Sequence, residues 1–167
     1  AKFQLFKRSL CYKINGVGLN LKINHLKKTI KKKQKIKKIL VIAAYKKEKG
    51  YPDILEVAAI LKNQKIKIEC YGDGDHHKFD SIKIEKKLHN ISFNKFDINL
   101  KNKIKNFDIL LHLSKREGLP VAVMQALSEG LPVICYDIRG NNDLVKDKFN
   151  GYFINSYKDV PGRIFYL

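Results

Sequence analysis

A strand–loop–helix–turn–strand pattern in the second half of the chain constrains the fold more than any other feature. Residues 108–113 (DILLHL) and 133–136 (VICY) are short apolar runs of the kind found in buried parallel strands. Pro120 suits the first turn of the intervening helix, where a missing N–H costs nothing, and Gly130 followed by Pro132 ends that helix. The pattern predicts a βαβ unit, which is the building block of a parallel α/β sheet.

The loop after the first of these strands is a candidate ligand-binding site. Residues 114–120 (SKREGLP) follow the carboxyl end of the strand, where open α/β sheets bind ligands, and lead into a helix start, where backbone N–H groups favour phosphate. Glu117 is unsuited to contact a phosphate, but it is well suited to accept hydrogen bonds from hydroxyl groups such as those of a sugar. Gln125 is the polar exception in an apolar helix and needs a hydrogen-bond partner if it is buried.

This stretch resembles the group 1 (glycogen-synthase-like) retaining glycosyltransferases, which have the GT-B fold and many of which build bacterial polysaccharides. The C-terminal domain of that family carries the pattern S-x-x-E-G-(x)-L-P…E-A-x-x-x-G-x-P-V-I…G…E-L-V…N-G. The residues at these positions of the pattern are Ser114, Glu117, Gly118, Leu119, Pro120, Gln125, Ala126, Gly130, Pro132, Val133, Ile134, Gly140, Asp143, Leu144, Val145, Asn150 and Gly151. Gln125 departs from the pattern, because the family has a second acid there that is usually credited with holding the nucleotide ribose.

The resemblance implies an α/β fold in which helices cover both faces of a Rossmann-like parallel sheet. It extends over about residues 12–160 and corresponds to a single half of the two-domain GT-B architecture, the C-terminal half that binds the donor. It divides the chain into a basic, lysine-rich linker (residues 1–38), a nucleotide-sugar-binding domain (residues 39–160) and a truncated C-terminal tail (residues 161–167). The acceptor-binding half has no counterpart in the sequence.

The resemblance also implies which residues bind a nucleotide-diphospho-sugar, with no metal and no other cofactor. Glu117 is then the catalytic residue, and it holds the sugar hydroxyls. Gly118, Leu119 and Pro120 bring the helix start to the diphosphate, and Gln125 contacts the ribose.

A second strand–loop–helix segment, residues 39–62, adds further candidates. Its loop keeps the E-K-G of the family pattern G-R-x-x-x-E-K-G, but Ala44 stands where the arginine belongs. Lys49 is therefore the main candidate for neutralising the diphosphate as a point charge. Lys46 and Lys47 are auxiliary candidates for phosphate contacts.

Further elements are predicted from apolar periodicity and turn residues. They are helices at residues 52–62, 78–88 and 97–105 and short strands within residues 39–43, 66–71, 90–96 and 152–154. The helix at residues 78–88 is expected to bury Phe79, Ile82, Ile84 and Leu88. Asp97 is expected to be the N-cap of the helix at residues 97–105. Residues 158–167 show no pattern that predicts a helix.

Residues 72–77 (GDGDHH) permit two interpretations. Asp73, Asp75, His76 and His77 offer the oxygen and nitrogen ligands of a metal site. Alternatively, the segment is a glycine turn whose acidic and histidine side chains are simply exposed at a helix start. We favour the turn, because the neighbouring motifs fit a fold that works without a metal.

Positive charge is concentrated at the start of the chain. The formal net charge is +18, and residues 1–38 contain no Asp or Glu and thirteen Lys or Arg. This segment is either an electrostatic surface for an anionic membrane or nucleic acid, or a solvated linker. Nucleic acid is the weaker alternative, because no aromatic side chain lies among the lysines of residues 25–38.

The cysteines and the hydropathy indicate the compartment. Cys11, Cys70 and Cys135 are odd in number and widely spaced, which favours a reducing environment over a disulfide framework. No apolar run approaches the ~20 residues of a transmembrane helix, and no signal peptide is visible. We therefore expect a cytoplasmic protein, peripheral on the inner membrane face if residues 1–38 bind lipid.

Three functions stay open. The leading hypothesis is the donor-binding half of a glycosyltransferase that moves a sugar from a nucleotide-diphospho-sugar to a polysaccharide or lipid-linked acceptor. Its acceptor-binding N-terminal domain is then a separate chain, or the sequence is a fragment. The second hypothesis is a catalytically inactive fragment or partner module that binds nucleotide-sugar. The third is a basic binder of membrane surfaces or nucleic acid.

Overall fold

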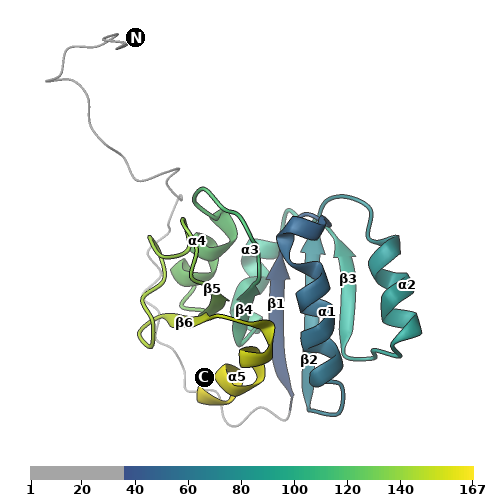
Figure 1. Ribbon diagram of the computed structural model, residues 1–167. Coiled ribbons are helices and arrows are strands. Elements are labelled where there is room, and N and C mark those ends of the chain that lie inside the picture. Colours follow the sequence, from purple (N-terminus) through teal and green to yellow (C-terminus); the bar gives the residue numbers. More distant parts are fainter. Residues whose placement is uncertain (1–35) are drawn as a thin grey trace, which may run out of the picture.

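Residues 36–167 form one six-stranded parallel sheet. The computed structural model describes residues 36–167, so nearly all of the basic segment predicted at residues 1–38, with its membrane and nucleic-acid interpretations, lies outside the described residues. The sheet order is β3-β2-β1-β4-β5-β6 (Figure 1). The strands are β1 (Lys37–Ile42), β2 (Ile66–Gly72), β3 (Ile91–Lys95), β4 (Ile109–His112), β5 (Val133–Tyr136) and β6 (Gly151–Ile154). This is the order of a doubly wound, Rossmann-like sheet, and it confirms the predicted fold class.

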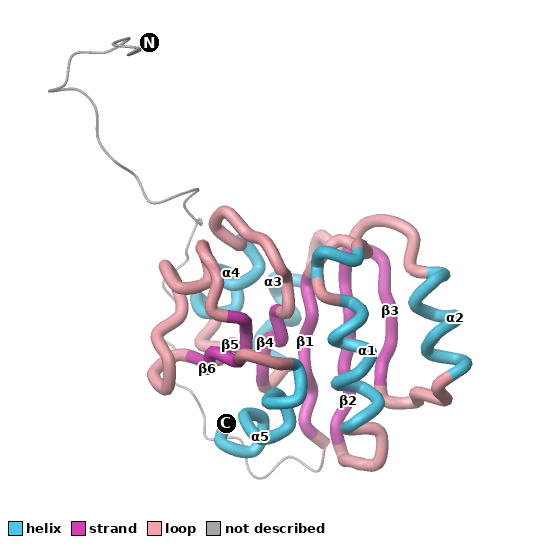
Figure 2. Tube along the Cα trace, in the orientation of Figure 1, coloured by secondary structure: helices cyan, strands magenta, loops and turns pink. Residues whose placement is uncertain are grey.

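Helices cover both faces of the sheet, as predicted (Figure 2). One face is covered by α1 (Tyr51–Ile60), α2 (His77–Glu85) and α5 (Val160–Tyr166). The other is covered by α3 (Leu100–Lys103) and α4 (Val121–Ser128). Short 3₁₀ helices complete the connections: η2 (Lys47–Lys49), η3 (Ile104–Asn106) and η4 (Tyr157–Asp159). None of the helices within residues 36–167 is both long and apolar enough to cross a bilayer.

The two central strands are buried on both faces. Successive residues of a strand point to opposite sides of the sheet, so Ile39 of β1 packs in the layer of α1 while Leu40 packs in the layer of α4. In β4, Leu110 and Leu111 divide in the same way. All four side chains are buried. This double burial explains why both strands are continuous apolar runs that the sequence alone reveals.

The end of the chain differs from the prediction. No helix was expected within residues 158–167, but α5 occupies Val160–Tyr166. Val160 and Ile164 lie one turn apart and are fully buried in the core cluster that includes α1. Pro161 lies in the first turn, where a proline is tolerated. The short helix therefore depends on packing against the core rather than on a propensity visible in the sequence.

Two smaller expectations are also wrong. Ile84 was expected to face inward, but its side chain is 74% exposed. It lies five residues after the buried Phe79, which places it about 140° around the helix. The third helix begins at Leu100 with Asn99 as its N-cap. Asp97 lies two residues earlier, where its Oδ1 accepts a hydrogen bond of 2.8 Å from the backbone N–H of Asn99.

Gly50 joins η2 to α1 at a point where two backbones meet. Its φ is +84°, in the left-handed region that favours glycine. A Cβ atom at this position would lie 2.0 Å from the carbonyl oxygen of Leu113, which follows β4. The loop after β1 therefore lies directly against the end of β4, and a side chain would force the two apart.

We predict that Gly50→Ala lowers the free energy of unfolding by at least about 2 kcal/mol, because the substitution adds backbone strain and a clash with Leu113. Urea unfolding measures this. Gly162→Ala is the matched control, since a Cβ there meets no atom within 4 Å. That control should be neutral or stabilising by up to about 1 kcal/mol, as alanine is the better helix former. Equal unfolding midpoints for the two variants would contradict the close approach at Gly50.

Candidate functional site

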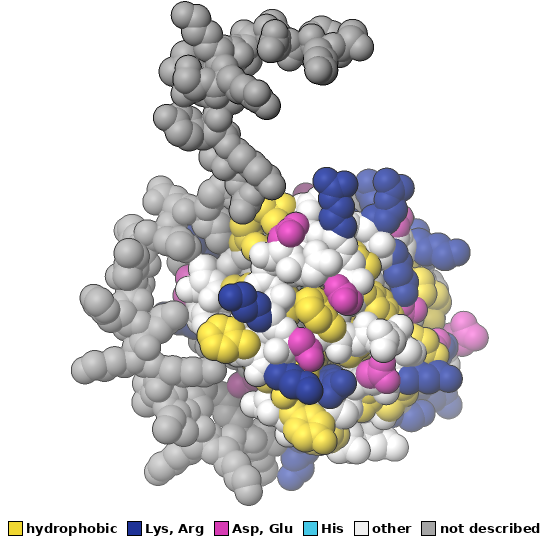
Figure 3. Space-filling model, turned by 60° about the vertical axis from the view of Figure 1, so that its left-hand side comes forward, with side chains coloured by type: hydrophobic (Ala, Val, Ile, Leu, Met, Phe, Trp, Pro, Cys, Tyr) yellow, Lys and Arg dark blue, Asp and Glu magenta, His cyan; other side chains and the backbone are white. Residues whose placement is uncertain are grey.

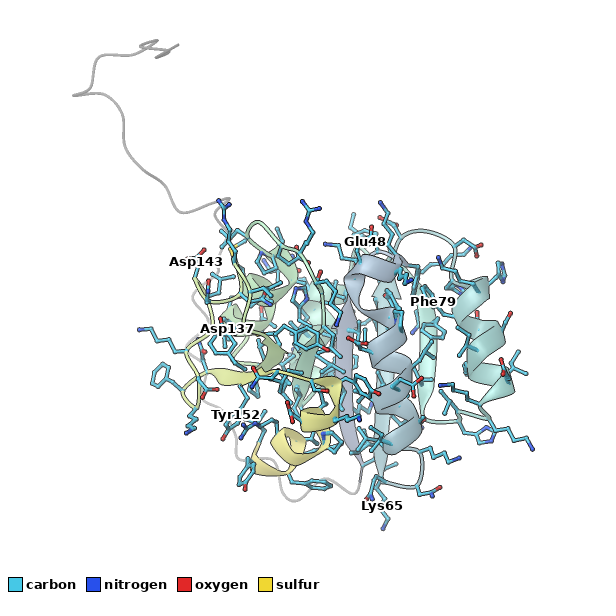
Figure 4. All side chains as sticks on the ribbon, viewed as in Figure 1. Glu48, Lys65, Phe79, Asp137, Asp143 and Tyr152 are labelled. Atoms are coloured by element: carbon cyan, nitrogen blue, oxygen red, sulfur yellow. The ribbon has the colours of Figure 1, made fainter. Side chains whose placement is uncertain are left out.

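The candidate site lies at the carboxyl edge of the sheet, between β1 and β4. These strands are neighbours, but the chain leaves β1 for α1 on one face and β4 for the α4 face on the other. Such a point of divergence leaves a crevice in which doubly wound folds bind ligands. The backbone N–H of Lys115 donates to the carbonyl oxygen of Glu48 at 2.9 Å and joins the two loops. Figure 4 shows Glu48 at this edge and Lys65 at the opposite edge.

Two residues predicted to bind the donor meet across this crevice. Nζ of Lys49, in the loop after β1, lies 2.8 Å from Oε1 of Glu117, in the loop after β4. The side chain of Glu117 is 12% exposed and that of Lys49 is 27% exposed. The pair is therefore partly shielded from water, and its attraction is stronger than that of a surface salt bridge.

Two further side chains approach Glu117 from beneath. His112, the last residue of β4, is only 4% exposed, and its Nε2 lies 3.4 Å from Glu117 Oε1. This distance gives an ion-pair contact, but Nε2 forms no hydrogen bond within residues 36–167. Ser114 is fully buried, and its hydroxyl donates to the carbonyl oxygen of Arg116 at 3.2 Å. His112 was not predicted as a site residue, because its only signal in the sequence is that it is polar within an apolar strand.

These neighbours decide the charge of Glu117. Burial alone would raise the pKa of its carboxyl group. The polar and charged neighbours His112, Lys49 and Ser114 outweigh burial and hold the pKa at about 2. Glu117 is therefore a carboxylate at neutral pH, which accepts hydrogen bonds and does not act as a proton donor.

The predicted helix start at α4 lies beside this carboxylate. Pro120 is the N-cap, and its carbonyl oxygen accepts from the backbone N–H groups of Val123 and Met124. Gly118 is exposed, and a Cβ there would meet nothing within 4 Å. The fold itself therefore does not require a glycine at this position, whereas a ligand that approaches the backbone would.

The glycine after β5 holds this loop in place. Gly140 has a φ of +89°, and a Cβ there would lie 2.2 Å from the carbonyl oxygen of Gly118 and 3.3 Å from Cδ of Pro120. The sequence analysis placed Gly140 in the family pattern without a structural role. Its role is to let the loop after β5 pack directly against the loop that carries Glu117.

The remaining predicted site residues are less closely tied to the ion pair. Gln125 is half-buried on α4, and its side-chain amide makes no hydrogen bond within the described part of the chain. Lys46 and Lys47 are exposed and form no ion pair with another described residue. Figure 3 shows Lys and Arg side chains gathered at the upper edge of the molecular face drawn there. Such an accumulation of positive charge attracts anionic ligands.

A second cluster of polar side chains borders the site. The Lys115 ammonium pairs with Oδ2 of Asp53 and lies 4.2 Å from the ring centroid of Tyr136. The Tyr136 hydroxyl donates to the same Asp53 oxygen at 2.7 Å, and burial together with this bond raises the Tyr136 pKa.

Pockets of about 390 and 260 Å³ lie on either side of Lys115, and Glu117 lines neither.

Two of the possible metal ligands of residues 72–77 form other contacts. Nδ1 of His76 pairs with Oδ2 of Asp80, and Oδ1 of Asp75 accepts from the backbone N–H of His77. Within residues 36–167, His, Cys, Asp and Glu side chains form no group of three or more that could hold a metal ion. The geometry gives no support to the metal interpretation.

Comparison with known proteins identifies the family. The model of the family "Glycosyl transferases group 1" matches residues 22–161. The chain belongs to this family. Over 53 residues it is 45% identical to the Escherichia coli UDP-Gal:alpha-D-GlcNAc-diphosphoundecaprenol alpha-1,3-galactosyltransferase. This alignment covers 32% of the chain and 14% of the E. coli protein.

Solved glycosyltransferases share the fold. Pneumococcal O-GlcNAc transferase GtfA, in complex with UDP and GlcNAc, superposes with a TM-score of 0.72 at 21% identity. The superposition covers 78% of this chain and 28% of GtfA. A GtfA/B complex gives a TM-score of 0.66 at 23% identity, over 74% of this chain and 25% of the matched one. The described domain therefore corresponds to a Rossmann-like part of GT-B enzymes, and the chain spans well under half the length of these relatives.

The ion pair at Glu117 predicts a specific pH dependence of stability. A carboxylate whose pKa falls on folding stabilises the folded state fully above its usual pKa of 4.5, and this stabilisation is lost as the pH falls to about 2. The contribution is on the order of 3 kcal/mol. We therefore expect the parent to be more stable than Glu117→Gln at pH 6, with a difference that shrinks towards pH 2.

Urea unfolding between pH 2 and pH 6 measures this difference. Glu85→Gln is the control, because it removes an exposed carboxylate at the end of α2. Its stability difference from the parent should stay small across the range. A Glu117→Gln difference that does not change with pH would show that the carboxylate is not held by these neighbours.

Proposed function

We propose that the chain is the donor-binding half of a retaining glycosyltransferase, which transfers a sugar from a nucleotide-diphospho-sugar to a polysaccharide or lipid-linked acceptor. The observation that carries this proposal is the meeting of Lys49 and Glu117 at 2.8 Å over the divergence of β1 and β4. One side chain suits phosphate and the other suits hydroxyl groups, and a sugar nucleotide contains both. Membership of the group 1 family supports the same assignment.

Each residue has a distinct task in this proposal. Lys49 leaves Glu117 and neutralises the diphosphate, and the backbone N–H groups at the start of α4 face the same anion. Negative charge develops on the diphosphate as the bond to the sugar breaks, so these donors assist departure of the leaving group. Glu117, ionised because of its neighbours, accepts hydrogen bonds from sugar hydroxyls and orients the ring. Gln125 contacts the ribose through a neutral amide.

Uridine is the nucleoside we propose for the donor. The name of the E. coli relative specifies UDP-Gal, and the solved GtfA contains UDP. The half that binds the acceptor is proposed to come from another chain or from another part of a longer one. The solved GtfA/B complex is a precedent for glycosyltransferase chains that assemble with partners.

A second candidate function is a partner module that binds the donor without turnover. The observations that favour it are the amide at Gln125 and Ala44 in place of the family's arginine. Both changes remove a charged group from the donor site of the family pattern. Donor binding with no transfer, even after a matching acceptor half is added, would favour this candidate.

Binding of UDP and UDP-galactose, measured by calorimetry, tests the site. We expect Lys49→Met to weaken both ligands by roughly ten- to a hundredfold, because a charge-assisted hydrogen bond is worth roughly 1.5–3 kcal/mol. Glu117→Ala should weaken UDP-galactose more than UDP, since only the former has the transferred sugar. Lys65→Met removes the same charge at the opposite edge of the sheet and should bind like the parent (Figure 4). No binding of UDP, UDP-galactose or UDP-N-acetylglucosamine by the folded parent would refute the donor site.

Gly118 offers a test that separates binding from folding. Its surroundings leave room for a methyl group, so Gly118→Ala should change the free energy of unfolding by less than about 0.5 kcal/mol. The added methyl should nevertheless weaken UDP-galactose, because it occupies the surface that the diphosphate approaches. Gly140→Ala is the contrasting variant and should destabilise the fold, since its Cβ overlaps the Gly118 carbonyl. Unchanged UDP-galactose affinity in Gly118→Ala would place the diphosphate elsewhere.

A further inference from the structure

Two basic side chains lie close to the same carboxylate oxygen of Glu117. Nζ of Lys49 lies 2.8 Å from Oε1, and Nε2 of His112 lies 3.4 Å from the same atom. Lys49 lies at hydrogen-bonding distance from this oxygen, whereas His112 makes only the longer contact. A buried N–H or ring nitrogen without a partner is costly, and Nε2 of His112 has none within the described residues.

The side chains of Lys49 and His112 differ in how freely they can move. Lys49 sits in η2 on a flexible side chain that is 27% exposed. His112 is 4% exposed, and its backbone pairs with Cys135 of β5 in the middle of the sheet. The imidazole is therefore held in place beneath the carboxylate, whereas the lysine can turn towards another anion.

We propose that His112 is a positioning residue for Glu117, which keeps the carboxylate in place when Lys49 turns to the diphosphate of the donor. This inference rests on the proposed function. When Lys49 departs, it no longer holds the carboxylate of Glu117, and a small movement of the carboxylate towards His112 closes the 3.4 Å gap. The Ser114 hydroxyl alone is a weaker anchor, because it has a single proton and also contacts the carbonyl oxygen of Arg116 at 3.2 Å.

This exchange of partners has a consequence for ligand recognition. Glu117 contacts the sugar in the proposed function, whereas the nucleotide diphosphate contacts Lys49. A loosened Glu117 therefore affects binding of the sugar but not binding of the nucleotide. His112 should matter for the affinity gained from the sugar and not for the affinity of UDP.

Calorimetry with UDP and UDP-galactose on the full chain tests this separation. His112→Leu should lower the affinity for UDP-galactose about tenfold, as expected for loss of a hydrogen bond to a charged group, and should change that for UDP less than about twofold. His112→Gln keeps an N–H donor and should restore most of the loss. In a Glu117→Ala background, His112→Leu should have no further effect. Equal losses for both ligands, or no rescue by glutamine, would mean that His112 only supports the fold.

A measurement without ligand separates this inference from the proposed function. In Lys49→Met, the NMR signals of His112 Nε2 and of the Glu117 carboxyl carbon should shift together, because the histidine takes over the vacated oxygen. Lys65→Met is the control and should leave both signals unchanged. Unmoved signals in Lys49→Met would overturn the role of His112. If the signals move but the parent binds none of the sugar nucleotides, the contact stands and the proposed function fails.

Discussion

The ion pair between Lys49 and Glu117 exists only because β1 and β4 are neighbours in the sheet. The two residues are 68 positions apart, and the parallel crossovers bring the carboxyl ends of their strands to one edge. A partly buried carboxylate is costly unless it is paired and hydrogen-bonded. Here Lys49, His112 and Ser114 together supply that compensation and keep Glu117 ionised. The negative charge of Glu117 thus depends on the order of the strands, which brings these neighbours to it, as well as on the residue itself.

Close backbone packing holds the loops that carry this pair. Gly50 lets the loop after β1 lie against Leu113, and Gly140 lets the loop after β5 lie against Gly118. The backbone bond from Lys115 to Glu48 joins the loops after β1 and β4 directly. Loops fixed in this way keep their side chains oriented before a ligand arrives, which lowers the entropy that binding costs.

The described domain presents the candidate site along one edge of its sheet. Glu117 lies outside both shallow pockets, which flank Lys115 instead. Ligand sites usually bury most of the ligand surface, and a single open edge of a sheet cannot do so. The chain also spans only 28% of the solved GtfA chain. In the proposed function, enclosure of the sugar nucleotide therefore needs a second surface opposite the carboxyl edge.

Apolar runs in the sequence were sufficient to predict a parallel α/β fold, because central strands buried on both faces are continuous apolar runs. Glu117 was named from its loop and from the family resemblance, and Lys49 from the resemblance. Local signals in the sequence were insufficient for α5, whose residues become helical through packing of Val160 and Ile164. They also did not reveal His112, because a polar residue in a buried strand becomes significant only when its neighbour is known. Which strands lie side by side, and therefore which charges meet at 2.8 Å, was decided by the tertiary structure alone, since long-range contacts leave no trace in local periodicity.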